Sequence, residues 1–135
     1  MADAVVNTTL RESPQWITVH LTNISDATGE SAVVKIDKSA IMVAGDGAEP
    51  AALDLVEIRW AIQGFTSVRL LWDHSTDDVC CVLSGNGYEN FARTGGGGVK
   101  ADPISSGGTG DVLLTTAGGA SGSTYDITAT FKKRS

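Results

Sequence analysis

Apolar and polar side chains alternate with a period of two residues along much of the chain. The clearest examples are residues 16–22, 56–62, 68–72 and 125–131. This period is typical of a β-strand with one face buried. Residues 79–83 are apolar throughout, which indicates a short, fully apolar strand. No stretch shows the period of a long helix.

Polar and glycine-containing segments separate these strands about every ten residues. Residues 23–30 form a predicted polar turn with Gly29, and 73–78 form a polar hairpin tip. Regular short strands of this kind predict an all-β fold: a single-domain antiparallel β-sandwich or small barrel of about seven or eight strands. Neither an internal repeat nor a domain linker is evident in the sequence.

The first 15 residues lack this clear alternation. Their apolar side chains are Val5, Val6 and Leu10, and Pro14 closes the segment. Terminal segments are often loose unless a neighbour holds them. We therefore divide the chain into an N-terminal arm or edge segment at 1–15 and a β-sandwich domain at 16–135. The two alternatives for the first segment are an arm that docks on a neighbour and an edge strand.

Glycine is concentrated in the second half of the chain, and residues 92–110 form a predicted long loop. Long loops are commonly functional or disordered. A phosphate-binding loop is excluded because Lys100 follows Val99 rather than glycine and no helix follows. Glycine instead lets a loop lie flat on another surface. The interface candidates in this loop are Gly95, Gly96, Gly97, Gly98 and Ile104.

The formal net charge of −6 limits the range of partners. An acidic surface repels phosphate, so we expect neither nucleic-acid binding nor attachment to anionic lipid. The longest apolar run has only five residues, too short to cross a membrane. The N-terminus has no basic leader and no long apolar segment, so we expect synthesis in a cytoplasm without a secretory signal.

The candidate catalytic groups do not form a recognisable catalytic arrangement. His20 is expected on the solvent face of a strand and His74 in a turn, and Ser84 lacks the surroundings of a nucleophile elbow. The adjacent Cys80 and Cys81 are best interpreted as reduced thiols that act as small apolar residues. We therefore expect no enzymatic activity and no cofactor.

Two other short patterns also favour ordinary structural roles. Asp73, Asp77 and Asp78 lie in one turn and could hold calcium, but a solvated hairpin tip is the favoured interpretation, so no metal site is predicted. Glycosylation motifs begin at Asn7 and Asn23, yet without a secretory signal they would not meet the modifying enzyme.

The three tryptophans fall into two groups. Trp60 and Trp72 share the parity of apolar neighbours, which indicates core packing. Trp16 shares the parity of Thr18 and His20, which places it on a polar face or at a strand entrance. Trp16 is therefore the best aromatic contact candidate.

Three sequence segments carry a family resemblance. They are LTNISDATGESAVVKID at 21–37, LLWD at 70–73 followed by an apolar strand and LSG at 83–85, and GTGDVLLTT at 108–116 followed by YDI at 125–127 and a terminal Lys-Lys-Arg strand. Together they resemble small all-β virion structural proteins of tailed bacteriophages. The resemblance covers about residues 20–134.

The resemblance implies a capsid decoration or cement protein that binds and stabilises the major capsid lattice. The expected partner of this chain is the major capsid protein. We expect the chain to lie on the capsid surface of the virion, in multiple copies per particle or as a homo-oligomer. We expect 1–15 and 92–110 to be the contact segments. The alternatives are a phage tail or fibre-associated structural protein, and a glycan-binding β-sandwich module that uses Trp16 and polar loops.

Overall fold

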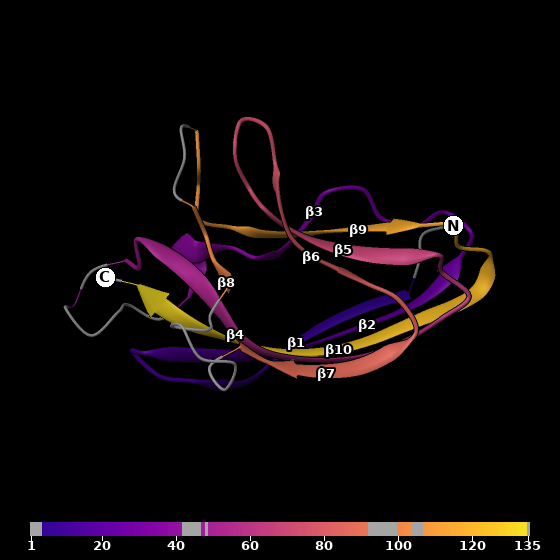
Figure 1. Ribbon diagram of the computed structural model, residues 1–135, viewed down its shortest axis with the longest axis horizontal. Coiled ribbons are helices and arrows are strands. Elements are labelled where there is room, and N and C mark those ends of the chain that lie inside the picture. Colours follow the sequence, from indigo (N-terminus) through magenta and orange to yellow (C-terminus); the bar gives the residue numbers. More distant parts are fainter. Residues whose placement is uncertain (1–3, 42–46, 48, 92–99, 104–106, 135) are drawn as a thin grey trace.

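Two antiparallel sheets lie face to face in the computed structural model, which describes residues 4–41, 47, 49–91, 100–103 and 107–134 (Figure 1). The strands are β1 (Ala4–Glu12), β2 (Trp16–Asp26), β3 (Val33–Ile36), β4 (Ala52–Gln63), β5 (Ser67–Trp72), β6 (Asp78–Leu83), β7 (Asn86–Asn90), β8 (Lys100–Ala101), β9 (Val112–Ala117) and β10 (Ser121–Arg134). A 3₁₀ turn, η1, spans Lys38–Ala40. The predicted all-β sandwich is confirmed, and the sheets do not close into a barrel.

The last strand, β10, lies at the centre of the larger sheet. The first sheet has the order β1-β2-β10-β4-β7, with β8 also paired to β4. The second sheet has the order β3-β9-β5-β6 and forms the other layer in Figure 1. β10 pairs along most of its length with β2 on one side and with β4 on the other. The C-terminal strand therefore joins segments from the beginning and the middle of the chain.

Ten strands are present in the described part of the chain, against the seven or eight predicted. The two additions are β1 and β8. The alternation of apolar and polar residues did not predict β1, because its side chains from Val5 to Leu10 are exposed on both faces of the sheet. β8 has only two residues, which pair with Asp54 and Leu55 of β4.

The sequence predicted that the strand ends at residue 22 and is followed by a polar turn, and this boundary is wrong. β2 continues to Asp26, and the inner-face residues Asn23 and Ser25 are buried. Glu30, expected in a solvated turn, is buried as well. Polar residues are tolerated at such positions when they contact one another, as Asn23 Nδ2 and Glu30 Oε1 do at 2.6 Å.

Side chains from the inner faces of both sheets form the core. β2 and β10 alternate buried and less buried residues over most of their length, as the period-two pattern predicted. Trp72 is buried and meets Phe131 edge to face across the two sheets, with ring centroids 6.2 Å apart. Trp60 is half-buried against the same core. Cys80 is buried, Cys81 is half-buried, and neither forms a disulfide.

Two isoleucines in neighbouring strands test the core. Ile127→Ala removes a side chain that is 0% exposed, whereas Ile24→Ala removes one that is 60% exposed. We expect the first substitution to lower the free energy of unfolding by about 2–5 kcal/mol, because it leaves a cavity. The second should change it by about 0.5 kcal/mol or less. Urea denaturation measures both, and equal losses would contradict this assignment of the core.

Candidate functional site

The open edge of β1 is the first candidate interaction site. Among the described residues, β1 pairs with β2 on one side and with no strand on the other. Val5, Val6 and Leu10 are all exposed on this strand, and Val6 is 57% exposed. The pairing of β1 with β2 is irregular between Thr9 and Arg11, so Leu10 lies at a β-bulge. We call this surface the β1 edge.

A tight turn at residues 13–15 connects β1 to β2. The Ser13 hydroxyl accepts hydrogen bonds from the backbone N–H groups of Gln15 and Trp16, at 3.3 and 3.1 Å. β2 then begins with Trp16 on the outer face of the first sheet, together with Thr18 and His20. Trp16 is exposed, which confirms the parity argument. The remaining interface candidates, Gly95, Gly96, Gly97, Gly98 and Ile104, lie outside the described residues.

A pocket of about 200 Å³ lies on the outer face of the first sheet. Its lining residues are Glu57, Arg59, Tyr88 and Thr128. The Tyr88 hydroxyl donates to Glu57 Oε2 at 2.6 Å, and the Arg59 guanidinium lies 5.5 Å from the centroid of the Tyr88 ring. The sheet register places Thr128 and Tyr88 on either side of Arg59. The result is a polar pocket with one aromatic wall.

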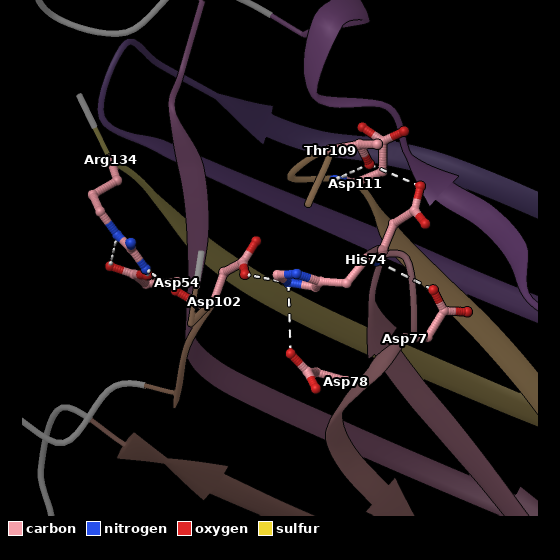
Figure 2. Close-up of polar contacts among 9 residues, drawn as sticks. Asp54, His74, Asp77, Asp78, Asp102, Thr109, Asp111 and Arg134 are labelled. Atoms are coloured by element: carbon pink, nitrogen blue, oxygen red, sulfur yellow. Dashed lines mark hydrogen bonds and ion pairs between the residues drawn. The ribbon is translucent and has the colours of Figure 1, made fainter. Parts of the chain in front are cut away.

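His74 is the centre of a third polar site, between the β5–β6 hairpin and the segment after β8. Its Nε2 lies 2.8 Å from Asp102 Oδ1 and 3.8 Å from Asp78 Oδ2 (Figure 2). The side chains of His74 and Asp102 are only 1% and 2% exposed. His74 is therefore buried within the hairpin turn, because a carboxylate brought from another segment covers its ring.

Further polar contacts surround this pair. Arg134 donates to the backbone carbonyl of Asp102 at 2.8 Å and also forms an ion pair with Asp54 of β4. On the hairpin side, Thr109 Oγ1 donates to Asp73 Oδ2 at 2.8 Å. We call His74, Asp102 and Arg134 the loop clamp, because they fix the described residues near Asp102 to the hairpin and to the C-terminal strand.

Asp111 lies beside the clamp and has a perturbed acidity. Burial raises the pKa of the Asp111 carboxyl above its ordinary value, and a hydrogen bond from the backbone N–H of Lys38 to the carboxylate partly offsets this increase. Asp37 and Asp73 raise the pKa further through charge repulsion. The folded state therefore binds this proton more tightly than the unfolded state. It follows that the contribution of Asp111 favours folding more at acid than at neutral pH.

Carboxylates contact both histidines of the chain. His74 contacts carboxylates, and the other histidine, His20, lies on the outer face with Nε2 2.7 Å from Asp126 Oδ1. In the described ranges, no group of three or more His, Cys, Asp or Glu residues is arranged to hold a metal ion. No helix in the same ranges is long and apolar enough to cross a membrane.

Comparisons of this chain with protein-family models, with curated proteins and with solved structures find no match. The surfaces and contacts described above are therefore the basis for any functional assignment.

The two His–Asp pairs provide a matched test of the loop clamp. Asp102→Ala should lower the free energy of unfolding by roughly 1–3 kcal/mol, because it leaves a buried imidazole without its carboxylate. Asp126→Ala removes the carboxylate from His20, whose side chain is 34% exposed, and should cost no more than about 0.5 kcal/mol. Denaturant titrations provide the comparison, and a neutral Asp102→Ala would contradict the clamp.

Proposed function

We propose that this chain is a non-enzymatic structural protein of a bacteriophage virion, a decoration or cement protein that binds the major capsid protein through the β1 edge. The observation that carries the proposal is the exposure of apolar side chains along an open strand edge. Strand edges of soluble proteins are usually protected by charge, proline or a covering segment. Residues 4–10 contain no charged side chain and no proline.

An extended segment of a partner would add to such an edge as a further strand. Backbone hydrogen bonds would then provide affinity, and alternate side-chain contacts would provide specificity. On this proposal, Val6 and Leu10 supply apolar contacts to the capsid protein, and Trp16 supplies an aromatic contact on the outer face. All three side chains are exposed in the isolated chain.

Repetition would make modest contacts sufficient for this role. A capsid presents many equivalent copies of its subunit, and a protein that bridges subunit boundaries gains avidity from simultaneous contacts. The low charged fraction of 19% is compatible with a surface that is partly covered in the assembled particle.

Substitution of matched edge valines tests this proposal. Val6→Lys places a charge on the β1 edge, whereas Val82→Lys places one on β6 at the edge of the second sheet; these valines are 57% and 60% exposed. Val6→Lys should reduce the number of copies per purified particle about tenfold, equivalent to about 1.4 kcal/mol of binding free energy. Val82→Lys should leave occupancy unchanged. Quantitative mass spectrometry of particles provides the measurement.

Melting temperatures of the isolated variants serve as the control, because both should fold as the wild-type chain does. Equal occupancy of the two variants would contradict binding through the β1 edge. The same quantification distinguishes a head protein from a tail protein. The copy number of a decoration protein follows the number of positions in the capsid lattice, whereas a tail or fibre-associated protein is present in far fewer copies.

A glycan-binding module is the second candidate, favoured by the pocket beside Tyr88. Aromatic rings and convergent polar groups are common features of small-molecule sites. This candidate predicts binding of the purified wild-type protein to a glycan array and loss of that binding in Arg59→Ala, with no loss in Arg69→Ala, which changes an exposed arginine in β5 of the second sheet. An array without wild-type binding would eliminate the candidate.

A further inference from the structure

Four polar side chains are buried together between the two sheets. Asn23 is on β2, Lys35 on β3, Tyr125 on β10, and Glu30 in the connection between β2 and β3. All four residues are buried, and the side chains of Lys35 and Glu30 are 0% and 5% exposed. Charged residues are rarely buried to this extent without a specific arrangement of partners.

The Glu30 carboxylate lies at the centre of the cluster. Its Oε2 is 2.5 Å from Lys35 Nζ, while its Oε1 accepts a hydrogen bond from Asn23 Nδ2 at 2.6 Å. The Tyr125 hydroxyl donates to the same Oε1 at 2.5 Å. One carboxylate therefore contacts both the lysine amine and the nitrogen of a carboxamide.

The ion pair itself is poorly satisfied. Although Lys35 Nζ and Glu30 Oε2 are close, neither atom makes a hydrogen bond of acceptable geometry to any residue that the structure describes. Lys35 Nζ also lies 6.0 Å from the centroid of the Tyr125 ring. A buried ion pair offsets its desolvation cost only when its remaining hydrogen bonds are complete. A reaction that removes the two charges would relieve this cost.

We propose that Lys35 and Asn23 form an intramolecular isopeptide bond, with Glu30 as the proton-transfer group. The Lys35 ammonium first gives a proton to the Glu30 carboxylate, which leaves a neutral amine. The amine nitrogen then attacks Asn23 Cγ and forms the new C–N bond. The bond from Cγ to Nδ2 breaks, and that nitrogen leaves as ammonia. The electron pair of the broken bond stays with the leaving nitrogen.

Glu30 contacts both nitrogens that exchange protons in this reaction. It delivers a proton to Asn23 Nδ2 as that nitrogen leaves, and it accepts a second proton from Lys35 Nζ as the amide forms. The second proton then passes from Glu30 to the released ammonia, which departs as ammonium ion, so the carboxylate is regenerated. No oxidant or second substrate is required. Burial of the cluster excludes water, which would otherwise compete as the nucleophile.

The bond would join the two layers of the sandwich. β2 belongs to the first sheet and β3 to the second, so the Asn23–Lys35 link crosses between them. Such a link holds both sheets together even when the non-covalent contacts open locally.

Mass spectrometry of the folded wild-type chain tests the proposal. The intact mass should be lower than the mass of the unmodified sequence by one ammonia. Trypsin should fail to cleave after Lys35, so the digest of the unfolded chain should contain a peptide of residues 12–38 that carries the whole deficit. Fragmentation should place the link between Asn23 and Lys35. A succinimide at Asn23 would give the same deficit but leave Lys35 cleavable, and that result would overturn the proposal.

Variants separate the proposed roles. Glu30→Gln and Asn23→Ala should both have the full mass, because one removes the proton-transfer group and the other the electrophile. Lys133→Arg is the matched control, because the Lys133 side chain is also 0% exposed and is paired with Glu12, and its substitution should preserve the deficit. If a variant fails to fold, the wild-type chain still tests the proposal. After prolonged incubation of the folded wild-type chain, an unmodified mass together with complete cleavage after Lys35 would overturn it.

Discussion

Burial of inner-face side chains between the two sheets is the constraint on which the rest of this structure depends. Residues of β10 such as Ile127 and Phe131 are almost completely buried, and they belong to the strand that joins β2 to β4. Burial of apolar surface supplies the main driving force for folding. The alternation that directs these residues inward also directs the threonines of β2 and β10 outward, so one pattern determines both the core and the polar outer face.

The limited extent of that core explains why the proposed interaction surface lies on β1. β1 adds to the first sheet beyond β2, and its side chains from Val5 to Leu10 remain exposed on both faces. The hydrogen bonds to β2 hold this strand in an extended conformation even though it contributes little to the core. A strand held in this way is suited to pair with a partner, because its ordering cost has already been met during folding.

Local periodicity was sufficient to predict most of the sandwich. The alternation in β2, in the second half of β4 and in β10 identified these strands and correctly placed Trp16 on the outer face. It missed β1, whose exposure removes the signal. It also missed the partners of Asn23, Glu30 and Lys35, because Tyr125 lies far away in the sequence.

Local sequence patterns also failed to predict the loop clamp. His74 and Asp102 lie 28 residues apart, and neither has a local pattern that predicts their contact. Such pairs arise when the fold brings two loops together, and their burial then makes a direct hydrogen bond necessary. Polar sites of this kind are therefore found from the three-dimensional structure, whereas the strands that position them can be read from the sequence.

Electron cryo-microscopy of purified phage particles tests the central claim most directly, since it shows both where the chain lies and which surface it uses. Our account predicts density for this sandwich at repeated positions on the outer capsid, with the β1 edge paired to an extended segment of the capsid protein. Heads without this density, or a sandwich bound to the capsid through β7 with the β1 edge left open, would contradict it.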